Sequence, residues 1–320
     1  MMLKSIKGND TMKQFRGALL LTLTALIWGT AFVAQSLGMD HLGPFTFNGV
    51  RNFVAALALL PVILFLRRRK SPAAQPGAAG NYRKTLWLGG VLCGVALAVA
   101  SSLQQIGIQF TTAGKAGFLT ALYIVVVPLL GLFFKKRVGL NIWISVVIAA
   151  VGTYLLSIKE NFTIGTGDLF VILCAVAFSV HILLIDRFSP LVSGVELSCV
   201  QFLTCGVLCT VAAFIMEQPN WNDILLSLGP ILYTGLMSSG VGYTLQIVGQ
   251  KVLNPTVAAL ILSLESVTSA IAGFIAYKIG FLGTDQTLTT RQLIGCAVVF
   301  AAVILVQIPW ENIIKKRKKS

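Results

Sequence analysis

The sequence predicts an all-α polytopic membrane protein with ten transmembrane helices, arranged as two inverted five-helix repeats. Composition is the first observation: 56% of the 320 residues are hydrophobic and only 11% are charged, whereas soluble domains carry roughly 25% charged residues. The second observation is a series of apolar segments of roughly 20 residues, the length that crosses a bilayer core. The third is an internal repeat that relates the two halves of the chain.

The repeat is seen at two offsets. Moved by 150 positions, residues 44–53 fall on 194–203; moved by 142, residues 103–107 fall on 245–249 and Gly131 falls on Gly273. The longer polar loop at 67–84 accounts for the change in offset. Because each half contains five apolar segments, an odd number, the second half enters the membrane from the opposite side. Inverted repeats are typical of secondary transporters, whose site lies between the repeats near the middle of the membrane.

The order of the elements follows from this repeat. We expect a cytoplasmic tail at 1–16, the first repeat at 17–157, a linker at 158–167, the second repeat at 168–309 and a basic tail at 310–320. The first span is longer than the apolar core of about 7–15 residues of a signal peptide, so we interpret it as an anchor. Pro128 is expected to bend the fourth span, and Asp168 to open the sixth as a charge favoured by the helix dipole. The spans are expected near 17–37, 44–66, 85–108, 112–134, 139–157, 168–185, 195–216, 228–248, 254–277 and 292–309.

The basic residues indicate the orientation. Most of the 25 Lys and Arg residues fall in segments on one side of the expected topology. Cytoplasmic segments carry such an excess, so we expect both termini in the cytoplasm and the protein in the plasma membrane, the inner membrane of a bacterium. The basic runs at 67–70 and 315–319 would then rest against anionic headgroups. The net charge of +14 therefore reflects topology, and we expect no nucleic acid partner.

Signatures of catalysis and of metal binding are missing from the sequence. The six cysteines lie in apolar segments without metal-site spacing, which is typical of small packing residues. No HExxH, GxSxG or P-loop motif occurs, and His41 and His181 are the only histidines. We therefore expect a protein that is not an enzyme and that has no cofactor and no metal site.

Glu265 is the sharpest candidate for a functional residue. It lies about eleven residues into the ninth span, where a carboxylate costs roughly 2.5–3.5 kcal/mol to insert, so it should face a cavity or a partner. It would bind a substrate ammonium group or take up a proton. The alternative is a buried acid held by Ser, Thr or Tyr neighbours.

Four further residues are candidates for substrate binding. Gln104 and Gln246 occupy equivalent positions of the repeat, and Tyr123 is equivalent to Glu265. Trp28 lies in the middle of the first span, where it would stack against a substrate. The alternatives are structural: amides join helices in lipid, by about 0.6 kcal/mol on average, and aromatic rings fill cores.

Arg51 and His181 join Glu265 as candidates for charge or proton coupling. Arg51 lies about seven residues, or about 10 Å, into the second span, where it would bind an anion, snorkel outward or pair with an acid. Gln201 takes its place in the second repeat. His181 would relay protons within the sixth span, or would be a packing residue.

Several motifs in this order resemble the drug/metabolite transporter superfamily, in particular its EamA family, over about residues 17–308. They are Trp28-Gly29-Thr30, Arg51-Asn52-Phe53, Thr111-Thr112-Ala113 and Leu264-Glu265-Ser266-Val267, together with the five-plus-five repeat. The resemblance implies ten helices, cytoplasmic termini and a central cavity that opens alternately to each side. It also implies small metabolites as substrates. Two positions depart from the family: Ser266 stands where it usually has proline, and Phe178 where it often has tryptophan.

These observations predict a gradient-driven secondary transporter of small metabolites such as amino acids or other amphipathic solutes, working by alternating access, with proton coupling as one option. No ATP-binding segment occurs. One alternative is a flippase of a phospholipid or an isoprenoid-linked sugar, which would need a lateral opening with basic residues at headgroup level. Another is a membrane scaffold or sensor. The expected partners are a small-molecule substrate and membrane lipids, and both a monomer and a homodimer remain open.

Overall fold

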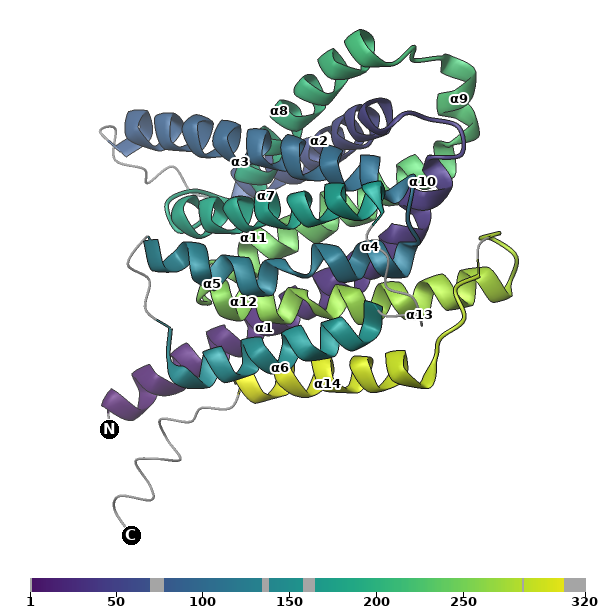
Figure 1. Ribbon diagram of the computed structural model, residues 1–320. Helices are drawn as coiled ribbons and strands as arrows, with labels where there is room; N and C mark the ends of the chain where they lie inside the picture. Colours follow the sequence, from purple (N-terminus) through teal and green to yellow (C-terminus); the bar gives the residue numbers. More distant parts are fainter. Residues whose placement is uncertain (1, 70–77, 134–137, 158–164, 284, 308–320) are drawn as a thin grey trace.

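The computed structural model describes residues 2–69, 78–133, 138–157, 165–283 and 285–307, and these residues form helices and loops with no strand among them. The helices gather in one bundle (Figure 1). The middle of the polar loop (70–77), most of the linker (158–164) and the basic tail (310–320) lie outside the described ranges. The helices are α1 (Met2–Gly38), α2 (Pro44–Arg69), α3 (Ala78–Ile108), α4 (Ala113–Thr120), α5 (Tyr123–Phe133), α6 (Leu140–Ser157), α7 (Thr166–Phe188), α8 (Gly194–Met216), α9 (Trp221–Leu226), α10 (Leu228–Leu232), the π-helix η1 (Tyr233–Tyr243), α11 (Thr244–Gln250), α12 (Pro255–Leu262), α13 (Leu264–Lys278) and α14 (Thr290–Gln307).

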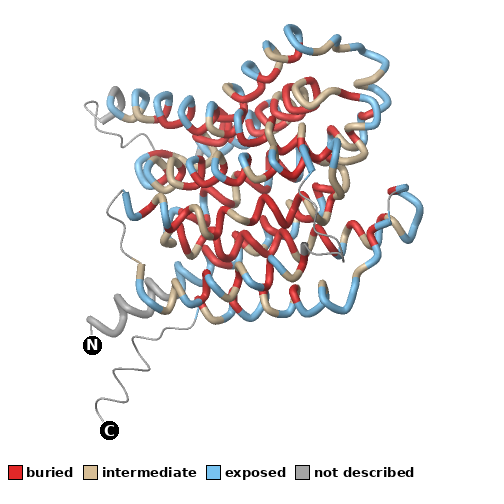
Figure 2. The backbone as a smooth tube through the Cα atoms, viewed as in Figure 1, coloured by how far each residue is buried: buried red, intermediate tan, exposed pale blue. Residues whose placement is uncertain are grey.

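The described part of the chain contains eight helical segments that are long and apolar enough to cross a membrane, and α6 adds a shorter apolar one. The expected eighth span falls on α10, η1 and α11. Buried residues fill the middle of the bundle and exposed residues lie on its outer faces (Figure 2). Many exposed side chains are large and apolar, among them Leu57, Leu64 and Val207. An outer surface this apolar fits lipid rather than water, and the chain is a multi-pass membrane protein.

Two of the expected spans are interrupted at equivalent positions. The first interruption separates α4 from α5 at Ala121, and the second separates α12 from α13 at Ser263, 142 residues later. At the first, the Leu122 N–H donates to the carbonyl three residues back; at the second, the Ser266 N–H does the same. This tighter spacing is that of a 3₁₀ turn. The fourth span is thus interrupted at Ala121, whereas Pro128 stands inside α5.

The interruption in the second half forms without a proline. The Ser263 hydroxyl donates to the Leu260 carbonyl at 2.7 Å, and the Ser266 hydroxyl donates to the Ser263 carbonyl at 2.7 Å. Serine hydroxyls that bond to carbonyls one turn back often bend helices. Although Ser266 departs from the resembled family, the chain is therefore still interrupted directly before Glu265.

Glycines bring helices together at matched places in the two halves. A Cβ on Gly107 in α3 would lie 2.7 Å from the Gly167 carbonyl oxygen in α7. A Cβ on Gly249 in α11 would lie 2.8 Å from the Gly17 carbonyl oxygen in α1. These backbones approach so closely because no side chain stands between them. The four glycines are equivalent in pairs at the offsets 142 and 150, so α3 meets α7 as α11 meets α1.

A second matched contact involves Gly94, which forms a GxxxG pair with Gly90. A Cβ on Gly94 would lie 2.7 Å from the Gln201 carbonyl oxygen, and one on Gly235 would lie 2.9 Å from the Arg51 carbonyl oxygen. Gly94 and Gly235 are 141 residues apart, one fewer than the offset found at the first contact. Gly235 lies inside the π-helix η1, and a π-bulge accommodates one additional residue in a helix.

Helices α2 and α8 pack antiparallel, and at each end a carboxylate of α8 or of the residue after it joins the two helices. At one end Glu217 accepts hydrogen bonds of 2.8 Å from the backbone N–H groups of Phe45 and Thr46, and so caps α2. At the other end Glu196 pairs with Arg67 at 2.8 Å. The beginning of each helix therefore meets the end of the other.

Asp168 lies in the first turn of α7, where the sequence predicts a helix start. Its carboxylate accepts a hydrogen bond of 2.8 Å from the Gly165 N–H, which caps the helix. It also forms an ion pair of 2.6 Å with Lys115 of α4, and a hydrogen bond of 3.1 Å with the Thr111 hydroxyl. This group of polar side chains fastens α4 to α7 at one end of the bundle.

Candidate functional site

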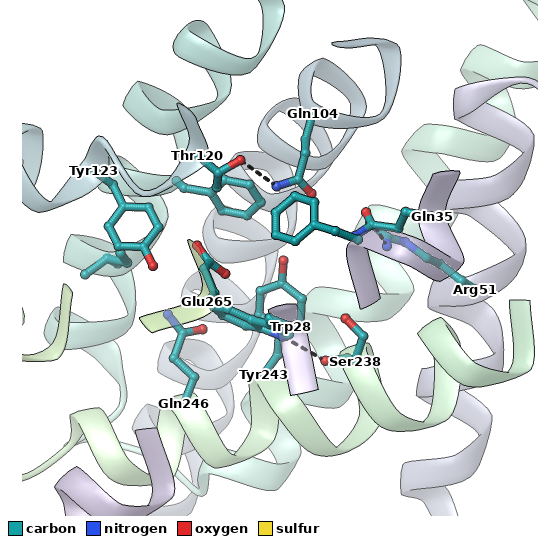
Figure 3. A pocket seen from close by; sticks show the side chains of 13 residues that line it. Trp28, Gln35, Arg51, Gln104, Thr120, Tyr123, Ser238, Tyr243, Gln246 and Glu265 are labelled. Atoms are coloured by element: carbon teal, nitrogen blue, oxygen red, sulfur yellow. Dashed lines mark hydrogen bonds between the residues drawn. The ribbon is translucent and has the colours of Figure 1, made fainter. Parts of the chain in front are cut away.

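A pocket lies in the middle of the bundle, where side chains from α1, α2, α3, α4, α5, α7, η1, α11 and α13 converge (Figure 3). Its cavity volume is about 20 Å³, enough for about one water molecule, so the bundle is closed around it. All five residues predicted to bind substrate, and also Arg51, line this pocket. The lining residues are Trp28, Phe32, Gln35, Arg51, Gln104, Thr120, Tyr123, Phe178, Ile182, Ser238, Tyr243, Gln246 and Glu265.

Much of the pocket wall consists of repeat-equivalent pairs. The sequence predicts two of these pairs, Gln104 with Gln246 and Tyr123 with Glu265, at the offset 142. The offset 150 adds two more pairs that line the same pocket. One is Trp28 with Phe178, and the other is the residue pair 32 and 182. The pocket is thus lined by equivalent positions of the two halves.

Glu265 lies in the first turn of α13, directly after the interruption at Ser263. Its side chain is 2% exposed, and its Oε1 atom has no hydrogen-bond partner in the described part of the chain. The Tyr123 hydroxyl faces the carboxylate (Figure 3). A carboxylate in the first turn of a helix is stabilised by the helix dipole, which offsets part of the cost of burying Glu265 away from water.

The two amides of the pocket have different surroundings. The Gln104 side-chain NH₂ donates to the Thr120 hydroxyl at 3.0 Å. The Gln246 Oε1 atom has no partner among the described residues. Buried polar atoms are nearly always hydrogen-bonded, so the free acceptor on Gln246 is a place for a ligand donor or a water.

Trp28 forms an aromatic wall and is held in place at its polar end. Its indole N–H donates to the Ser238 carbonyl in η1 at 3.1 Å. Its ring lies 4.5 Å from the Tyr243 ring, measured between centroids, with the planes tilted by 53°. The pocket therefore offers a fixed aromatic surface beside its charged groups.

Arg51 is 3% exposed and lies inside the bundle, so it does not snorkel outward. Its guanidinium donates to the Gln35 Oε1 atom at 3.1 Å and lies 5.6 Å from the centre of the Phe47 ring. The Nε atom has no hydrogen-bond partner in the described ranges, and no carboxylate within them pairs with Arg51. A buried cation without an anion is costly, which makes Arg51 a natural place for a ligand anion.

His181 lies behind the pocket wall. Its Nε2 atom is hydrogen-bonded to the Gln201 Oε1 atom at 3.1 Å. Its ring meets Phe178 and Tyr243 edge-on, with centroid distances of 6.5 and 5.8 Å. His181 therefore does not line the pocket but contacts two residues, Phe178 and Tyr243, that do.

Sequence reasoning did not select seven of the lining residues. The repeat alignment contained the signal for Phe178 and for the pair 32 and 182, because Phe178 is equivalent to Trp28. Gln35 is an amide side chain within an apolar segment, and the same feature is seen at Gln104, which was predicted to bind substrate. Ser238 and Tyr243 belong to the π-helix, whose register cannot be read from a helical pattern. No group of His, Cys, Asp and Glu residues in the described ranges is arranged to hold a metal ion.

Comparisons with known proteins agree with this architecture. The sequence model of the EamA-like transporter family matches residues 15–158 and again 165–308. An uncharacterized transporter of Archaeoglobus fulgidus is 30% identical over 308 residues, which cover 96% of this chain and 90% of that protein. The uncharacterized inner membrane transporter YedA of Escherichia coli K12 is 25% identical, over 88% of this chain and 87% of that protein. A protein of known crystal structure has the same fold, with a TM-score of 0.69 and 17% identity over 91% of this chain and 95% of that chain. Matches along both halves, and a relative similar over nearly its whole length, show that this chain belongs to the EamA-like transporter family.

Proposed function

We propose that the protein is a gradient-driven secondary transporter of small amphipathic metabolites such as amino acids. The observation that carries this proposal is the closed central pocket, which contains a carboxylate and a guanidinium, both buried and neither paired with an opposite charge among the described residues. Burying two such groups separately costs several kcal/mol in each case. A folded chain keeps them when a ligand supplies the missing partners.

A zwitterionic solute satisfies both groups at once. Its ammonium group would bind Glu265 and donate a hydrogen bond to the free Gln246 oxygen, while its carboxylate would bind Arg51. The two charged side chains lie on different sides of the pocket (Figure 3). The apolar part of the solute would pack against Trp28 and Tyr243. The pocket holds only about one water in this conformation, so its walls have to separate before a solute enters.

The architecture that we propose for transport has ten spans in two inverted repeats, at 17–157 and 168–309. The matched glycine contacts and the paired interruptions support an equivalence of the halves. The antiparallel packing of the equivalent helices α2 and α8 supports their inversion. Alternating access would then result from rocking of one group of helices against the other around the pocket.

We propose an orientation with both termini in the cytoplasm of a bacterium. The beginning of α1 and the end of α14 lie at the same end of the bundle (Figure 1), as this orientation requires. The excess of basic residues in segments at that end is the positive-inside signal. In this orientation the ion pair between Lys115 and Asp168 lies at the outer end.

The flippase alternative has less support. It needs a lateral path with basic residues at headgroup level that leads to the site, yet the pocket's only guanidinium is 3% exposed and enclosed by the bundle. Scramblase assays beside solute uptake separate the two functions. A scaffold without transport would gain support if no solute raised the melting temperature of the purified protein, since a ligand stabilises the state it binds.

The test of the transport proposal is uptake by proteoliposomes. A thermal-shift screen of amino acids and small amines selects solutes, and their uptake is then driven by a pH gradient. Glu265→Gln keeps the shape of the side chain but cannot carry a charge or exchange a proton, and we expect it to abolish uptake. Asp40→Asn, the same change at an exposed position, should leave uptake intact. Unchanged uptake by Glu265→Gln would refute the assigned role.

A further inference from the structure

A second, larger cavity lies far from the central pocket, between α2, α3 and α8. Its volume is about 990 Å³, and its walls are mostly apolar. We call it the α2–α3–α8 groove. The residues that line it are Leu60, Ile63, Leu64, Arg67, Tyr82, Arg83, Lys84, Leu86, Trp87, Glu196, Cys199, Val200 and Leu203.

The groove has a basic rim and an apolar wall. Arg67 lies near the end of α2, and Arg83 and Lys84 lie near the beginning of α3, so all three cations stand at one end. From Arg67 the wall runs inward to Leu60, a distance of about 10 Å at the helical rise per residue. Leu64 and Trp87 of this wall are exposed on the outer face of the bundle, where lipid tails lie. An amphiphile would therefore place its head at the rim and its tail along the wall.

Two of the three cations are free to bind an anion. Glu196 pairs with Arg67 at 2.8 Å and accepts a hydrogen bond of 2.6 Å from the Tyr82 hydroxyl, which closes the floor of the rim. Arg83 and Lys84 are exposed and have no ion pair among the described residues. The rim thus keeps a net positive charge after its internal pairing is complete.

The repeat shows that this basic rim is specific to one end of the molecule. Arg67 is equivalent to Glu217 at the offset 150, and residues 83 and 84 are equivalent to Leu225 and Leu226 at the offset 142. The corresponding place at the other end of the bundle therefore has no cation at these positions. Repeat architecture alone does not produce the rim.

We propose that the α2–α3–α8 groove is a binding site for a phospholipid with an anionic headgroup, such as phosphatidylglycerol. Arg83 and Lys84 hold the phosphate and the headgroup, with Arg67 beside them, and one acyl chain lies along Leu64 and Trp87. A zwitterionic lipid brings its own cation to the rim and binds less well. Each basic residue near a charged membrane surface contributes about 1 kcal/mol, which corresponds to about a fivefold change in affinity.

Trp87 provides the measurement, because it lines the groove and is 58% exposed. The full-length protein is reconstituted in phosphatidylcholine vesicles that contain increasing fractions of either phosphatidylglycerol or phosphatidylcholine with brominated acyl chains. Bromine quenches a tryptophan that it contacts, and subtraction of the signal of Trp87→Phe isolates residue 87. We expect half-maximal quenching at an about fivefold lower fraction of the brominated anionic lipid.

Two double variants separate the groove from general surface charge. Arg83→Gln with Lys84→Gln should remove the preference for the anionic lipid. Arg68→Gln with Arg187→Gln removes the same amount of charge from exposed positions outside the groove. This control variant should retain the preference for the anionic lipid. Equal quenching of Trp87 by the two brominated lipids would overturn the proposal. An equal loss of the preference for the anionic lipid in both double variants would also overturn it. Displacement of the brominated lipid by glycerol phosphate in solution would also overturn it, because the site would then recognise a soluble anion.

Discussion

At the residue scale, the central pocket is defined by two ionisable groups, Glu265 and Arg51, that have no oppositely charged partner among the described residues. Arg51 is equivalent to Gln201, which is hydrogen-bonded to His181 rather than directed into the pocket. One half of the repeat thus supplies a cation at this position and the other supplies an amide that joins helices. Glu265 and Tyr123 also differ in chemical character, although both of them line the pocket. The polarity of the site arises where equivalent positions carry different residues, and the proposed zwitterionic solute would therefore bind in only one direction.

Arg51→Gln should separate binding from stability. Loss of the guanidinium leaves the solute carboxylate unpaired, and we expect binding to weaken by about 2 kcal/mol or more, roughly 30-fold. The free energy of unfolding should stay equal or increase by about 1 kcal/mol, because a buried charge without a carboxylate is removed. Calorimetric titration and thermal melting measure the two effects. Arg68→Gln, on the exposed face of α2, is the matched control.

The same variant tests which end of the solute Arg51 binds. Amines that lack a carboxylate should bind to Arg51→Gln as they bind to the unchanged protein. A similar loss of affinity for amines and for amino acids would show that Arg51 supports the pocket without binding the solute.

At the scale of elements, the two interrupted helices place the central residues. Each interruption lies two residues before Tyr123 or Glu265, so that α5 begins at Tyr123 and α13 at Leu264. The hydrogen-bond pattern is already irregular at Ser266, whose N–H donates to the Ser263 carbonyl three residues back. This irregularity explains how one family accommodates both proline and serine at the position.

Ser266→Pro should therefore be tolerated. The substitution removes one hydrogen bond at a place where the helix is already interrupted, and we expect a loss of about 1 kcal/mol. Ser179→Pro, in the uninterrupted helix α7, should cost about 3 kcal/mol or more, because it breaks a regular helix. Thermal melting in detergent compares the two. A loss for Ser266→Pro as large as that for Ser179→Pro would contradict the assigned role of the interruption.

At the scale of the whole molecule, the sequence predicted the helical class, the membrane and the family, and the structure and comparisons confirm these. Apolar segments of bilayer length and a charge asymmetry are properties of the sequence itself. The gathering of Gln104, Gln246, Tyr123 and Glu265 in one pocket also follows from the repeat, since equivalent positions meet near a shared axis. The interruption at Ala121 and the π-helix were not predicted. Both arise where backbone N–H groups bond to a carbonyl three or five residues back instead of four. These segments are apolar on every side, so the hydrophobic periodicity of the sequence does not reveal such a change.

In the proposed alternating access the ends of the bundle open in turn, and the ion pair between Lys115 and Asp168 is a contact that would hold one end closed. Asp168 also caps α7 through Gly165, so Lys115 is the partner to change. Lys115→Gln removes the attraction only in the state in which α4 and α7 touch. A partly exposed pair contributes up to about 1 kcal/mol, so the open state at this end should become up to about fivefold more populated.

The opening can be measured at Ser238, which lines the pocket and is buried in the closed state. In cells that carry Ser238→Cys, a membrane-impermeant thiol reagent added outside should react up to about fivefold faster when Lys115→Gln is also present. The same cells without Ser238→Cys give the background from the native cysteines. Lys251→Gln removes a charge at the end where α1 begins and should not accelerate the reaction. Equal rates with and without Lys115→Gln would show that other contacts keep the outer end closed, and the rocking of α4 against α7 would then have to be sought elsewhere in the bundle.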